Sequence, residues 1–199
     1  MSDILKQLLG QMGPNAIQAI SNQIGADEGQ TTNALSGILP TLIGAMANNS
    51  KTQEGANDLL GALDRDHDGS ILDDVAGFVS NYNDGPGAGI LKHVLGDNQT
   101  TVENNLSSKT GLNGGQISNL LKIAAPLVLG YLGKQKRQSS SQGFDIGSIA
   151  DLLGGMTNQA DKATGIDLGD VLNMVGGLTG GSSGRSGGIG GLIGKLFGK

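Results

Sequence analysis

The chain has 199 residues, a formal net charge of −5, 36 glycines and no cysteine or tryptophan. The absence of cysteine excludes disulfides, thiolate zinc sites and cysteine nucleophiles, and the acidic balance argues against a nucleic-acid partner. Only 3% of the residues are aromatic, so a core must be built from aliphatic side chains, which favours helix packing over a β-sandwich.

The first predicted helices lie within residues 4–46. Apolar residues recur at helical spacing in residues 4–12 and again in residues 17–24. A broader apolar stripe over residues 31–46 predicts a longer helix. Pro40 lies inside this stripe, so the helix either kinks there or ends and restarts.

The middle of the chain, residues 47–89, has the pattern of a helix–loop–helix. An amphipathic stretch occupies residues 56–63, an aspartate-rich loop follows, and a second predicted helix covers residues 72–82. The sequence Asn83-Asp84-Gly85-Pro86-Gly87 then predicts a turn.

Residues 90–132 repeat residues 4–46 at an offset of 86. Of the 43 aligned pairs, 13 are identical, which indicates a duplication. The identical pairs include Ile4-Leu5-Lys6 with Ile90-Leu91-Lys92, Pro40 with Pro126, and Gly44 with Gly130. Such glycines would let another helix approach closely. We therefore predict an all-α fold over residues 1–133, in which two pseudo-symmetric helical halves are joined by the helix–loop–helix.

The composition changes after the second repeat. Residues 134–143 form a polar linker with a basic start, and residues 144–199 form a Gly/Ser-rich tail. Within the tail, residues 144–156 recur as residues 166–178, and each copy predicts a short amphipathic helix. Helices this short are marginal alone, so they need a partner surface on this protein or on another molecule.

The aspartate-rich loop matches the start of an EF-hand calcium loop. Its sequence, Asp64-Arg65-Asp66-His67-Asp68-Gly69-Ser70, places carboxylates at positions 1, 3 and 5 and a glycine at position 6. Calcium is a hard cation that takes oxygen ligands, and the main-chain carbonyl at position 7 supplies one more. The sequence therefore predicts a Ca²⁺ site within residues 64–75. The predicted ligands from this motif are Asp64, Asp66, Asp68 and Ser70.

Position 12 departs from the EF-hand pattern, because it is Val75 instead of a bidentate glutamate. Asp73 and Asp74 stand at positions 10 and 11. A shortened loop, as in dockerin-like or excalibur-like relatives of the EF-hand, would bring one of them to the ion. Asp74 is the favoured ligand and Asp73 the alternative. The loss of the glutamate should weaken affinity toward the micromolar-to-millimolar range.

The competing interpretation of this loop is a solvated turn whose carboxylates only cap the following helix. Three carboxylates spaced two residues apart repel one another without a cation, so the pattern favours calcium.

No motif in the sequence indicates an enzyme. The chain lacks a nucleophile elbow, a phosphate loop and an HExxH pair, and its glycine pairs do not follow a predicted strand. No stretch reaches the roughly 18 apolar residues of a membrane span. No signal peptide is visible either, so a cytoplasmic location is expected, with leaderless export left open.

Residues 1–135 resemble the bacterial YidB-like proteins of the DUF937 family. The resemblance rests on Gly29-Gln30-x-x-Asn33-x-Leu35 with the later Pro40, and most specifically on residues 63–77, which contain the aspartate-rich loop. It implies a small helical bacterial protein without an established activity. The glycine-rich tail lies outside the resemblance.

The favoured functional interpretation is a non-enzymatic calcium-binding protein that acts through protein–protein interaction or self-association, using its helical bundle or its tail. The alternative is a membrane- or envelope-associating protein that uses residues 189–199 as an interfacial anchor. Lys195 and Lys199 suit a bilayer surface, but the short length and the glycine content of this segment make such binding weak. A hydrolase whose site assembles only in the folded chain is the third and least favoured interpretation.

Overall fold

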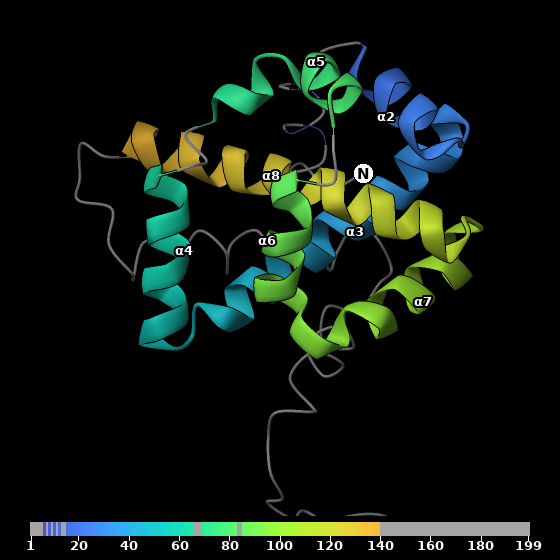
Figure 1. The fold of residues 1–199 in the computed structure, drawn as a ribbon. Helices are drawn as coiled ribbons and strands as arrows, with labels where there is room; N and C mark the ends of the chain where they lie inside the picture. Colours follow the sequence, from blue (N-terminus) through green and yellow to red (C-terminus); the bar gives the residue numbers. More distant parts are fainter. Residues whose placement is uncertain are drawn as a thin grey trace, which may run out of the picture.

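The computed structural model describes residues 15–65, 69–82 and 85–139, together with Lys6, Leu8, Gly10 and Met12. Every regular element within these residues is helical, as the aliphatic composition predicts (Figure 1). The predicted linker is described only as far as residue 139, and the predicted tail at 144–199 lies outside the described residues.

The described elements follow the predicted order along the chain. They are α2 (Ala16–Ile24), α3 (Glu28–Asn49), α4 (Gln53–Arg65), the 3₁₀ helix η1 (Ser70–Leu72), α5 (Val75–Ser80), α6 (Gly85–Leu95), the 3₁₀ helix η2 (Gly96–Asn98), α7 (Gln99–Thr110) and α8 (Gly114–Ser139). The helix predicted over residues 72–82 is therefore split and shortened. Its first residue belongs to η1, and α5 begins only after a capping aspartate.

The two long helices, α3 and α8, cross at the centre of the molecule and supply much of the core (Figure 1). Ile38 and Leu42 of α3 and Leu120 of α8 are completely shielded from solvent. Both helices continue through their prolines, Pro40 and Pro126, so the alternative in which each helix ends and restarts there is wrong. Packing on all sides of these helices holds them together where the proline removes a backbone hydrogen bond.

The shorter helices owe their boundaries to local sequence signals. α2 and α7 each end at a glycine in the left-handed conformation, Gly25 with φ 67° and Gly111 with φ 77°. α8 begins with a reciprocal cap, in which the Gln116 N–H donates to Asn113 Oδ1 and the Asn113 N–H donates to Gln116 Oε1, both at 3.0 Å. Gln116 Nε2 also donates to the Gly25 carbonyl at 2.8 Å, which ties the start of α8 to the end of α2.

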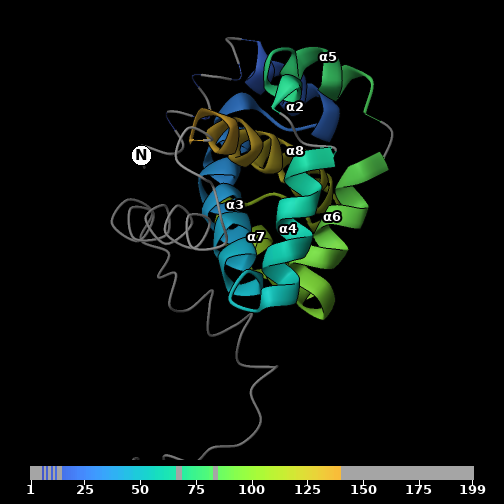
Figure 2. The same cartoon turned by 90° about the vertical axis from the view of Figure 1, so that its left-hand side faces the viewer.

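The remaining helices are arranged around α8. α2 and α5 contact each other at one end of the molecule, α7 packs on α3 and α8, and both α4 and α6 rest on α8. In Figure 1, α4 and α6 lie on the same side of α8 and apart from one another, and Figure 2 shows the same two helices from the side. Within the described part of the chain, no helix is long and apolar enough to cross a membrane.

Candidate functional site

The predicted calcium loop lies between the end of α4 and the start of α5, and its second half contacts α8 through η1. Two of the predicted ligands, Asp66 and Asp68, fall outside the described residues. The other four, Asp64, Ser70, Asp73 and Asp74, fall within them.

Gly69, at position 6 of the loop, adopts φ 93° and ψ −5°. An EF-hand loop needs a glycine at this position for its sharp turn, because side chains other than hydrogen disfavour positive φ. A Cβ atom here would also lie 2.9 Å from Lys134 Cβ and 3.0 Å from the Gly130 carbonyl oxygen. Both the backbone conformation and the contact with α8 therefore require glycine.

The residue at position 8, Ile71, explains why α8 has a glycine opposite the loop. A Cβ atom on Gly130 would lie 2.5 Å from Ile71 Cγ2, far inside normal contact distance. The sequence predicts that another helix approaches closely at Gly130. The helix that does so is the short 3₁₀ helix η1. The two glycines, Gly69 and Gly130, together let the second half of the loop lie directly on α8.

Asp64, at position 1 of the loop, has a side chain that is 65% exposed, and its Oδ1 lies 2.5 Å from Lys136 Nζ on α8. Its negative charge is thus partly neutralised by a lysine, with which a calcium ion would compete. Ser70, at position 7, accepts a hydrogen bond from the Asp73 N–H at 3.0 Å through its carbonyl oxygen. A carbonyl oxygen has two lone pairs, so this bond is compatible with a second interaction.

The two candidates for completing the site differ in what they already do. Asp74 caps α5, because its Oδ1 accepts a hydrogen bond from the Gly77 N–H at 2.8 Å. This is the role that the competing interpretation of the loop predicts, although the second carboxylate oxygen of Asp74 is compatible with metal binding. Asp73 ends η1 and has an exposed side chain.

The described carboxylates alone do not make a metal centre. Within residues 15–65, 69–82 and 85–139, no three histidine, aspartate or glutamate side chains gather in a way that would hold an ion. The conformation of Gly69 and the Ser70 carbonyl fit a calcium loop, and a complete ligand set requires Asp66 and Asp68 as well.

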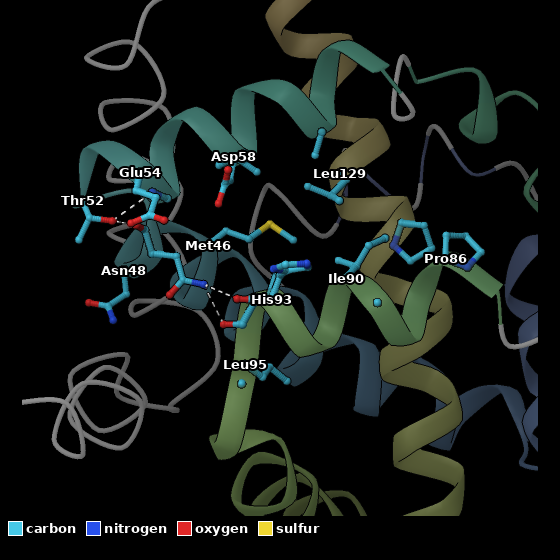
Figure 3. Close-up of a pocket in the computed structure, with 18 of the residues that line it drawn as sticks. Met46, Asn48, Thr52, Glu54, Asp58, Pro86, Ile90, His93, Leu95 and Leu129 are labelled. Atoms are coloured by element: carbon cyan, nitrogen blue, oxygen red, sulfur yellow. Dashed lines mark hydrogen bonds between the residues drawn. The ribbon is translucent and has the colours of Figure 1, made fainter.

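An open groove of about 1480 Å³ adjoins the loop, between α4 and α6 (Figure 3). Its floor is apolar and comes from two helices, with Met46 at the end of α3 and Pro126 and Leu129 on α8. Half-buried Leu59 of α4 and Ile90 of α6 line its two walls. Gly69, Ser70 and Ile71 of the loop also line it, so the groove and the predicted calcium site share residues.

The charged side chains that line the groove are acidic. They are Glu54 and Asp58 of α4 and Asp97 of η2, and none of the lysines or arginines in the described residues lines it. Figure 3 shows Asp58 and His93 directed from α4 and α6 into the space between these helices. An apolar floor beside the acidic residues of α4 and η2 favours a ligand that is both apolar and cationic.

Hydrogen bonds hold the walls of the groove in place. Asn49, the last residue of α3, donates through Nδ2 to the carbonyls of His93 at 2.9 Å and Val94 at 3.1 Å, and so anchors the end of α6 (Figure 3). Thr52 Oγ1 accepts from the Gly55 N–H at 3.1 Å and caps the first turn of α4. The groove is thus preformed, and its lining comes from segments too far apart in the sequence for periodicity to reveal it.

A family model described as a bacterial protein of unknown function, DUF937, matches residues 6–135. This range includes α2 to α7 in full, most of α8 and the whole aspartate-rich loop. Comparison with curated proteins and with solved structures finds no match.

Proposed function

This chain belongs to DUF937, a bacterial family of unknown function, and we propose that it is a non-enzymatic calcium-binding protein that acts through protein–protein interaction or self-association. In the proposed architecture, a duplicated helical bundle carries an EF-hand-like loop between its halves, and a glycine-rich tail follows. Because the loop lacks a glutamate at position 12, the ion would be structural or environment-sensing, with modest affinity.

The element boundaries support the duplication. At the offset of 86 residues, the end of α2 at Ile24 maps onto the end of α7 at Thr110. The start of α3 at Glu28 maps onto the start of α8 at Gly114. Both short helices stop at a left-handed glycine, and both long helices contain a proline at the equivalent position.

The observation that carries the calcium proposal is the left-handed conformation of Gly69 directly after three alternating aspartates. Capping of α5 by Asp74 needs neither the earlier aspartates nor this turn. A cation surrounded by Asp64, Asp66 and Asp68 accounts for both features, since it would offset the repulsion between their charges. The Ser70 carbonyl, with Asp74 or Asp73, would complete the oxygen ligands.

The acid-lined groove supports the interaction part of the proposal. Soluble proteins keep large apolar concavities mainly where something binds. The groove is open to solvent and its walls are held by hydrogen bonds, so it presents a preformed surface to a peptide or helix.

Calcium titration followed by thermal unfolding of the full chain tests the proposal. Binding to the folded state alone should raise the midpoint with calcium concentration, by about 8 °C at 100 times the dissociation constant. The variant Asp66→Ala should lose this response, whereas Asp58→Ala, an exposed aspartate of α4 outside the loop, should keep it. An unchanged midpoint up to several millimolar calcium in the native chain would reject the site.

A further inference from the structure

We propose that the groove between α4 and α6 binds the C-terminal segment of the same chain, residues 189–199. This inference rests on the interaction part of the proposed function and names the ligand. It is independent of calcium, because the acidic and apolar residues that it uses lie outside the aspartate-rich loop.

The residues of the C-terminal segment match those of the groove. Its apolar residues are Ile189, Leu192, Ile193, Leu196 and Phe197. Their spacing of i, i+3, i+4, i+7 and i+8 would place all of them on one side of a helix. The same segment contains Lys195 and Lys199 and no acidic residue. An apolar face with positive charges beside it is the complement of an apolar floor flanked by the acidic residues of α4 and η2.

The dimensions also agree. A helix of residues 189–199 would be about 16 Å long, and α6, which forms one wall of the groove, likewise has 11 residues. Leu59 and Ile90 on the two walls and Leu129 on the floor offer apolar contacts to the buried face of such a helix. Asp58 and Glu54, at adjoining turns of α4, would then face its lysines.

The connecting chain is long enough for the segment to reach the groove within one molecule. Residues 140–188 separate the end of α8 from the segment. A stretch of 49 residues can extend to roughly 160 Å at most, whereas α8, whose Pro126 and Leu129 form the floor, is about 39 Å long. Attachment to the same chain raises the concentration of the segment near the groove above that of a free peptide in micromolar solution.

This attachment favours the chain's own segment over an independent partner or a membrane. The segment has four glycines, and each costs roughly 1 kcal/mol relative to alanine when it becomes helical. A free peptide or a membrane anchor of this sequence would therefore bind weakly. A segment of the same chain can occupy the groove despite a weak intrinsic affinity, because the covalent connection raises its concentration near the groove.

Cross-linking in the full chain tests the proposal. The native chain has no cysteine, so every thiol is an introduced one. The pair His93→Cys and Gly198→Cys joins the groove to the segment. The matched control is Lys92→Cys with Gly198→Cys, because Lys92 is exposed on the same helix but does not line the groove. We expect the His93 pair to form an intramolecular disulfide roughly tenfold faster than the control at low micromolar protein.

A charge exchange separates specific docking from random collision. Asp58→Lys alone and Lys195→Glu alone should each slow cross-linking of the His93 pair about threefold, and the two together should restore the rate. Asn104→Lys, an exposed site on α7 away from the groove, should change nothing.

Three results would overturn the proposal. Equal rates for the His93 and Lys92 pairs would mean that the segment does not dock in the groove. If cross-links formed only between two molecules and were lost on dilution, the groove would bind the segment of a second copy of the chain. Capture of the full chain on anionic phospholipid vesicles, abolished by Lys195→Glu while the two cross-linking rates are equal, would make a membrane the ligand.

The same measurements in EGTA keep the two proposals separable. Fast cross-linking of the His93 pair without calcium, together with no thermal response to calcium, would support docking and reject the calcium site. A normal thermal response with equal cross-linking rates would reject docking and leave the calcium site supported.

Discussion

Replacing Gly69 by alanine tests the most specific geometric feature of the loop. The new methyl group would have to sit at φ 93°, 2.9 Å from Lys134 Cβ and 3.0 Å from the Gly130 carbonyl oxygen. Both contacting atoms on α8 are fixed by its backbone, because one is a carbonyl oxygen and the other a Cβ, so neither can move away by a side-chain rotation. The control is Gly111→Ala, where φ is 77° and a Cβ would meet nothing within 4 Å.

The two substitutions should differ in their cost to the free energy of unfolding. A left-handed non-glycine residue costs about 1–2 kcal/mol, and alanine recovers roughly 0.4–1 kcal/mol by restricting the unfolded chain. Gly111→Ala should therefore destabilise by about 1 kcal/mol. Gly69→Ala adds an overpacking term of about 1–3 kcal/mol, which brings its expected cost to roughly 2–4 kcal/mol.

Equilibrium urea unfolding in EGTA measures both costs without any contribution from calcium. Asparagine at the same two sites gives a second comparison, because asparagine tolerates the left-handed conformation but still carries a Cβ. Gly111→Asn should be nearly neutral, whereas Gly69→Asn should stay destabilised. If Gly69→Ala cost no more than Gly111→Ala, the close contact between η1 and α8 would be incorrect.

Substitutions at three further residues probe the loop and the groove. Lys136→Met removes the cation beside Asp64, so the calcium concentration at half-saturation, followed by thermal unfolding, should fall about two- to fivefold; a rise would contradict competition between lysine and ion. Asp74→Asn should still accept the hydrogen bond from the Gly77 N–H and leave the free energy of unfolding in EGTA unchanged, whereas Asp74→Ala should lower it by about 1 kcal/mol. If Asp74→Asn also leaves the thermal response to calcium intact, Asp74 is not a ligand. Asn49→Ala removes the side-chain donor to two carbonyls at the end of α6 and should cost about 1–2 kcal/mol in urea unfolding; no loss would show that this contact does not hold the groove wall.

Much of the fold was predictable because helical signals are local. Apolar spacing located most of α2 and α3, the repeat extended this prediction to α7 and α8, and a scarcity of aromatic residues indicated the all-α class. Two points stayed open in the sequence. A proline in a helical pattern predicts either a kink or a break, and packing on every side keeps α3 and α8 continuous. Asp74 remains a predicted calcium ligand, and its carboxylate also caps the start of α5.

Some features of the candidate site follow from the local sequence, and others follow only from contacts between residues far apart along the chain. The sequence alone determined the alternating aspartates, the glycine at position 6 and the missing glutamate at position 12, because these lie within twelve consecutive residues. Only the tertiary structure decided that Lys136, 72 residues away, pairs with Asp64. Sequence periodicity reports which face of a helix is buried, and it carries no information on which distant helix lies opposite.

The groove depended entirely on the folded chain. Its lining comes from α3, α4, η1, α6, η2 and α8, and no single segment contains enough of these residues to form a motif. Glu54, Asp58 and Asp97 are exposed residues of helices. Their convergence over an apolar floor followed only from the packing of α4 and α6 on α8, because helix packing brings together residues that lie far apart along the chain.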